Sequence, residues 1–176
     1  MNVQGDRLAQ LLAALATALA DRINDAAAED AGAGAMVPAA LTSLQTRPAS
    51  TIDGLRRVLG LTHSATVRLV DRLAERDLVR RTPGRDRRSV ELRLTPAGSA
   101  VAQSILDSRL RLARQVLGDL DAGRLATLTE WVEGALEQLP AGRREARTIC
   151  RLCDHSRCTA AGTGCPVDRG ATVREA

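Results

Sequence analysis

Residues 51–96 decide the fold and read TIDGLRRVLGLTHSATVRLVDRLAERDLVRRTPGRDRRSVELRLTP. Gly60 lies between two groups of apolar residues and can supply a left-handed helix cap, while Thr62 can cap the start of the next helix. Two helices joined by a turn that contains glycine are typical of a helix-turn-helix. The residues that mark the two short helices are Leu55, Val58 and Leu59 in the first and Val67, Val70 and Leu73 in the second.

The remainder of this stretch predicts a β-hairpin and then a helix. Residues 89–94 alternate polar and apolar side chains, and we expect them to pair with the Leu-Val-Arg-Arg run at 78–81. Thr95 can cap a helix that has Pro96 at its first position and ends near residue 118. The predicted fold class is therefore mostly α with a small β-hairpin wing: a winged helix-turn-helix with N- and C-terminal dimerisation helices.

Composition favours duplex DNA as the partner of such a domain. The chain has 176 residues, of which 44% are hydrophobic, and its formal net charge is +4. The positive charge is carried by arginine, whose fork-shaped guanidinium suits phosphate and guanine. Phe and Tyr are absent and Trp131 is the single aromatic residue, so the stacking platforms used by most single-strand and RNA binders are missing.

Candidate DNA contacts fall on the second short helix and on the tip of the hairpin. In a helix-turn-helix the second helix enters the major groove with its N-terminal residues on base edges, and an arginine on a wing can enter a narrow minor groove. His63 is treated only as a base or phosphate contact, because an exposed histidine is more often a polar surface residue than a proton switch. The candidates are His63, Ser64, Thr66, Arg68 and Arg72 on the helix and Arg85, Arg87 and Arg88 on the wing.

The flanking segments predict long helices with apolar stripes. Residues 6–28 carry a leucine stripe, a loop or frayed helix end follows at 26–35, and a short helix is expected at 38–45. A last helix at 122–139 presents a seam that we expect to face a partner. The seam residues are Leu125, Leu128, Val132, Ala135 and Leu139.

The N-terminal apolar stretch does not predict a targeting segment. Residues 11–20 are apolar and end in Ala-Leu-Ala, as a secretory cleavage site does, but the helical stripe continues past that point to Ile23. No apolar run is long enough to span a bilayer. We therefore expect a cytoplasmic protein without a membrane segment.

The order of these motifs resembles the MarR family of winged-helix regulators. The motifs are Gly-Leu-Thr at 60–62, Val-Asp-Arg-Leu at 70–73, Leu-Val-Arg-Arg at 78–81, Asp-Arg-Arg at 86–88 and Leu-Arg-Leu-Thr-Pro-Ala-Gly at 92–98. The resemblance covers about residues 6–140. It implies a homodimer whose terminal helices form the interface and whose two winged domains bind an inverted repeat in double-stranded DNA.

The chain departs from the family pattern in two places. Asp77 stands where the family usually has glycine, and we expect the turn to survive because Asp tolerates the left-handed conformation better than most residues. The family's effectors often bind between the dimer helices and the DNA-binding domain. This chain lacks aromatic residues there, so a small-molecule effector is a possible partner whose identity the sequence does not indicate.

The four cysteines, Cys150, Cys153, Cys158 and Cys165, all lie in the C-terminal tail. This clustering is typical of metal ligands in a reducing compartment rather than of a disulfide framework. Zinc suits four thiolates and is the favoured cofactor. An iron-sulfur cluster is the alternative, because a Cys-Pro pair ends some cluster motifs. His155 is a possible substitute ligand, and uncoordinated thiols in a disordered tail remain the third alternative.

These observations divide the chain into four expected parts. They are an N-terminal dimerisation helix and loop at 1–35, a winged helix-turn-helix at 36–95, C-terminal dimerisation helices at 96–140 and a cysteine-rich metal-binding tail at 141–176. The predicted function is that of a DNA-binding transcriptional regulator and not of an enzyme, modulated by a ligand or by the metal or redox state of the tail. The alternatives are a thiol-disulfide redox protein that uses Cys150 and Cys153, or an interaction adaptor that does not bind DNA.

Overall fold

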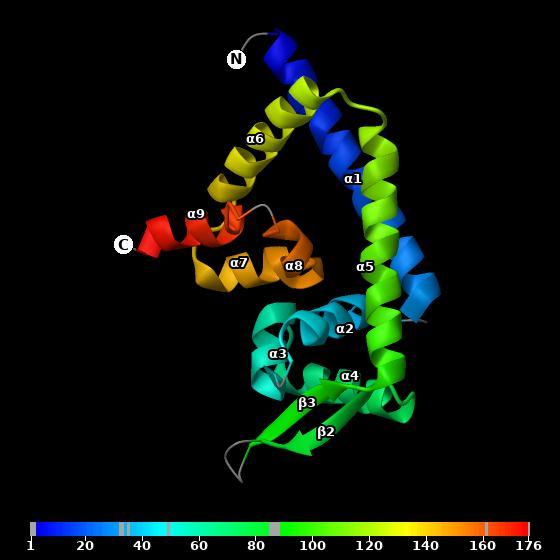
Figure 1. Ribbon diagram of the computed structural model, residues 1–176. Coiled ribbons are helices and arrows are strands. Elements are labelled where there is room, and N and C mark those ends of the chain that lie inside the picture. Colours follow the sequence, from blue (N-terminus) through cyan, green and yellow to red (C-terminus); the bar gives the residue numbers. More distant parts are fainter. Residues whose placement is uncertain are drawn as a thin grey trace.

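The computed structural model describes residues 3–31, 34, 36–48, 50–84, 89–160 and 162–175. It is mostly helical with a small antiparallel sheet, as the sequence predicts (Figure 1). A winged domain lies at one end and long helices extend away from it. The elements of the winged domain are α2 (Val37–Thr46), β1 (Ser50–Thr51), α3 (Ile52–Leu59), α4 (His63–Glu75), β2 (Val79–Pro83) and β3 (Val90–Leu94).

Local capping places α3 and α4 as predicted. Gly60 has a φ of 67° and ends α3, and the Thr62 side chain accepts a hydrogen bond from the Ala65 amide at the start of α4. Thr51 caps α3 in the same way, through the Gly54 amide. The buried core beneath these helices is made of Leu41, Leu55, Leu69, Val70, Leu73, Leu92 and Ile105.

The sheet has the strand order β1-β3-β2, and all pairs are antiparallel. β2 and β3 form the predicted wing, with Val79 opposite Leu94 and Pro83 opposite Val90. β1 was not predicted. Its two residues are too short to show a periodicity, and they become a strand only by pairing with Leu92 and Glu91.

Two long helices connect the winged domain to the far end of the molecule. α5 (Pro96–Leu117) begins at the Thr95 cap and packs along α1 (Val3–Ala31), which is longer than the predicted helix at 6–28 (Figure 1). The segment expected as a loop or frayed helix end from residue 26 is helical up to Ala31. α6 (Ala122–Gln138) follows α5 with Asp121 as its cap.

The C-terminal tail is also helical, which the sequence analysis did not predict. Its elements are α7 (Arg143–Ile149), the short 3-10 helix η1 (Cys150–Leu152), α8 (His155–Cys158) and α9 (Pro166–Glu175). A small separate core of Ala146, Cys165, Val167 and Ala171 holds them together. This core consists of small side chains without a clear period, so the sequence pattern did not reveal it.

Candidate nucleic-acid interface and cysteine pocket

The outer face of α4 carries most of the predicted DNA contacts. Leu69, Val70 and Leu73 are buried against the core, and this fixes which side of the helix faces solvent. His63, Ser64, Arg68 and Arg72 are exposed on that side. His63 and Ser64 stand in the first turn, where the helix also presents backbone amides to an anion.

Thr66 does not belong to this face, and its predicted exposure was wrong. Its relative exposure is 0%, and its hydroxyl donates a hydrogen bond to the Thr62 carbonyl at 2.9 Å. A threonine hydroxyl that bonds back to the preceding turn can be buried without an unpaired polar atom. Thr66 therefore belongs to the packing surface of α4.

The wing is fastened to α4 by an ion pair that sequence reasoning missed. Arg81 on β2 contacts Asp71 on α4, with Nη2 2.6 Å from Oδ1. Nothing in the sequence singles out this pair, because β2 comes alongside α4 only in the folded domain. Arg80 is exposed beside it. The predicted wing contacts Arg85, Arg87 and Arg88 lie outside the described residues.

Asp77 adopts the left-handed conformation, with a φ of 53°, as predicted for the turn between α4 and β2. Its carbonyl accepts a hydrogen bond of 2.5 Å from the Thr95 hydroxyl. The same Thr95 oxygen accepts a bond from the Gly98 amide. The start of the wing and the start of α5 are thus joined at one threonine.

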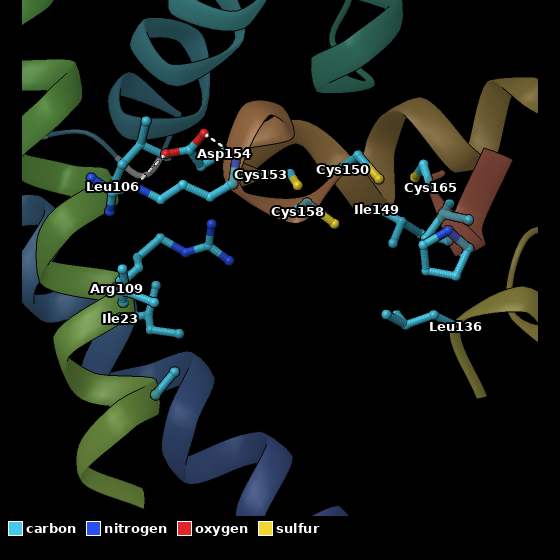
Figure 2. A pocket seen from close by; sticks show the side chains of 15 residues that line it. Ile23, Leu106, Arg109, Leu136, Ile149, Cys150, Cys153, Asp154, Cys158 and Cys165 are labelled. Carbon is cyan, nitrogen blue, oxygen red and sulfur yellow. Dashed lines mark hydrogen bonds and ion pairs between the residues drawn. The ribbon is translucent and has the colours of Figure 1, made fainter. Parts of the chain in front are cut away.

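The four cysteines line a single cavity of about 460 Å³ between α5 and the tail (Figure 2). Neighbouring thiols lie close enough to shift one another's pKa. All four are free thiols, and Cys165 is buried. In the part of the chain that the structure describes, no three His, Cys, Asp or Glu side chains converge as ready-made ligands of one metal ion.

Neighbouring thiols and burial shift the pKa values of Cys150, Cys153 and Cys158 in different directions. The Cys153 thiol donates to Cys150 and lowers the pKa of Cys150. The same bond, together with burial, raises the pKa of Cys153. Burial is the main cause that raises the pKa of Cys158. Of Cys150, Cys153 and Cys158, Cys150 is the one whose pKa is shifted toward the thiolate.

Arginine side chains border the thiols on the α5 side. Figure 2 shows Arg109 extending from α5 toward the cysteines, and its buried Nε has no hydrogen-bond partner among the residues that the structure describes. Desolvation by burial lowers the pKa of Arg109. Arg157 of α8 reaches Asp107 of α5 at 2.9 Å and Asp154 at 3.2 Å. His155 does not line this cavity; it lines a neighbouring pocket of about 300 Å³.

The tail is attached both to the winged domain and to α6. On one side, the Thr42 and Ser43 hydroxyls of α2 lie 2.9 and 3.1 Å from the Arg151 carbonyl, within the Cys150–Cys153 turn. On the other side, α9 packs on α6 so closely that a Cβ at Gly170 would lie 1.9 Å from the Glu137 carbonyl oxygen. Arg169 of α9 also forms an ion pair with Glu137.

A family model described as the MarR family matches residues 35–89, which span α2, the helix-turn-helix and most of the wing. The winged domain of this chain therefore resembles that of the MarR family. Among solved structures, a MarR family protein from Bacillus stearothermophilus is 25% identical with a TM-score of 0.64, and the match covers 75% of this chain and 93% of that one. RV1404 from Mycobacterium tuberculosis is 26% identical with a TM-score of 0.60, covering 76% and 94%.

A variant of MarR from E. coli, complexed with operator DNA, has the same fold at 23% identity, with a TM-score of 0.54 over 80% of this chain and 100% of that one. A comparison with curated proteins found no match. The match to the MarR family model ends at residue 89, so it does not include the cysteine tail. Among the described helices, none is long and apolar enough to cross a membrane.

Proposed function

We propose that this MarR-family transcriptional regulator binds duplex DNA through the exposed face of α4 and the wing. The observation that carries the proposal is the first turn of α4, where His63 and Ser64 are exposed beside Arg68 and the β2–β3 wing. Polar side chains at that place reach base edges when a recognition helix lies in the major groove. Such a regulator acts in the cytoplasm, where promoter DNA and reduced thiols are found together.

Homodimerisation is the second part of the proposal. α1 and α6 expose apolar side chains that a monomer would leave in water, and rows of this kind mark protein interfaces. A dimer would present two α4 helices to the two halves of an inverted repeat. The exposed residues are Leu8, Leu11, Leu12 and Leu15 on α1 and Leu125, Trp131, Val132 and Leu139 on α6.

Metal binding by the tail is the third part. Four thiols along one cavity, without a disulfide between them, support thiolate ligation of zinc or of an iron-sulfur cluster. The redox-enzyme alternative for Cys150 and Cys153 loses its support, because the family consists of transcription regulators. The described sheet also has antiparallel pairs only, whereas a thioredoxin-like dithiol belongs to a βαβ unit.

The DNA-binding proposal is tested by selecting duplexes from a random library with the full-length protein and measuring affinity at physiological salt. Arg68→Ala should weaken binding to the selected duplex about ten-fold or more, since an arginine contact to a base or phosphate is lost. Arg144→Ala, on an exposed position of α7 outside the winged domain, is the matched control and should bind normally. If no duplex is enriched, the adaptor alternative replaces this proposal.

A further inference from the structure

The cysteine pocket is larger than one metal ion requires. A structural zinc site is closed, with four ligands at about 2.3 Å from one centre. Here all four thiols border the same pocket, whose volume of about 460 Å³ has room for a group of several atoms. We propose that this cavity holds an iron-sulfur cluster ligated by Cys150, Cys153, Cys158 and Cys165, an inference that rests on the proposed metal-binding role of the tail.

The walls of the cavity suit a cluster better than water. Most of the lining residues that are not cysteines are apolar and offer few hydrogen bonds to water. A single zinc ion bound by the thiolates would leave most of this volume unfilled. A core of several iron and sulfide atoms would fill more of the pocket volume. The apolar lining comes from Ile23, Leu106, Leu110, Leu136, Ile149 and Val167.

The charge next to the thiols is also suited to an anionic group. Four thiolates give a cluster a negative charge, which is unfavourable in an apolar cavity unless a cation or a hydrogen-bond donor lies beside it. Arg109 provides both, and its buried Nε has no partner among the described residues. We assign Arg109 as a positioning residue that donates to the cluster or its thiolates and thereby tunes the reduction potential.

The test uses the full-length protein purified without oxygen from iron-supplemented cells. Iron, acid-labile sulfide and zinc are measured per chain, together with the visible absorption spectrum. The expected result is iron with a matching amount of sulfide and a broad charge-transfer band. One zinc per chain without a visible band would overturn the cluster in favour of a closed zinc site, and protein without either metal would overturn it as well.

Variants separate the cluster from a general effect on folding. Cys165→Ser should lose iron and sulfide together, whereas His155→Ala should keep both, because His155 lies on the neighbouring pocket. Arg109→Leu should retain the cluster about ten-fold less well. It should also make the reduction potential of the remaining cluster more negative, because a nearby positive charge is gone. Arg109→Lys should restore part of both effects, and an unchanged potential in Arg109→Leu would remove Arg109 from the proposal.

The same preparation distinguishes failure of the cluster from failure of the regulator. A protein that contains the cluster but selects no duplex would disprove DNA binding and leave the cluster in place. A protein that binds a selected duplex but carries stoichiometric zinc would disprove the cluster and leave DNA binding in place.

Discussion

At the scale of single residues, Asp77 shows how one backbone angle joins the recognition helix to the wing. An L-residue in the left-handed conformation carries a steric penalty that glycine does not. We expect Asp77→Gly to raise the free energy of unfolding by only roughly 0.5 kcal/mol, because the larger loss of chain entropy by glycine on folding offsets part of the relieved steric penalty. Denaturant unfolding of the wild-type chain and the variant measures this difference in the free energy of unfolding. Asp77→Ala should lower the free energy of unfolding, and equal stability of the two variants would contradict the explanation.

Gly98 is required by a close approach rather than by a turn. A Cβ at this position would lie 1.9 Å from the carbonyl oxygen of Leu78, a backbone atom that cannot rotate away. Gly98→Ala should therefore lower the free energy of unfolding by at least about 2 kcal/mol, as overpacking does elsewhere. Ala97→Ser, an exposed neighbour, serves as the control and should change stability by less than about 0.5 kcal/mol.

Thr66 marks the limit of reasoning from residue polarity. It lies three, four and seven positions before Leu69, Val70 and Leu73, so helical spacing alone places it on the buried stripe. The sequence interpretation placed it outside because its side chain is polar. The Thr66 hydroxyl donates to the Thr62 carbonyl, so it needs no contact with water. Helical periodicity therefore predicts the burial of Thr66 better than the polarity of its side chain.

At the scale of elements, the sequence predicted the helix ends and strands that depend on interactions between residues near one another in the chain. The caps at Gly60, Thr62 and Thr95 and the strand β3 were predicted correctly, although Val90 at the start of that strand is exposed. β1 and the Arg81–Asp71 ion pair depend on contacts made only after folding, so no short window of sequence contains them. The gathering of the thiols could be expected from their spacing, but the cavity depends on how α5 packs against the tail.

The attachment of η1 to α2 can be tested by removing its donors. A double substitution, Thr42→Val with Ser43→Ala, removes both hydroxyls near the Arg151 carbonyl, and each lost bond costs about 1 kcal/mol. Amides in η1 should then exchange with deuterium faster. Thr46→Val is the matched control, because the Thr46 hydroxyl bonds only to carbonyls of its own helix. Equal protection of η1 in the double variant would show that these bonds do not hold the tail.

At the scale of the whole molecule, the exposed apolar faces predict a dimer that one charge can disrupt. Val132 on α6 is 40% exposed in the single chain. Val132→Asp would bury a carboxylate without a partner in the expected interface, which is strongly unfavourable. Sedimentation velocity should show the wild-type chain as a dimer and this variant shifted toward the monomer. Val173→Asp, on α9 outside the two apolar faces, should remain dimeric.

The double attachment of the tail has a geometric consequence. A winged domain joined to the dimer helices only through α5 could pivot about the start of that helix. The tail adds a second connection, because it contacts α2 and α3 on one side and α6 on the other. The winged domain is therefore held at two places, by α5 and by the tail, which restricts its rotation relative to the long helices. In a dimer the orientation of the winged domain sets the separation of the two α4 helices, which must match half-sites one DNA turn apart, about 34–36 Å.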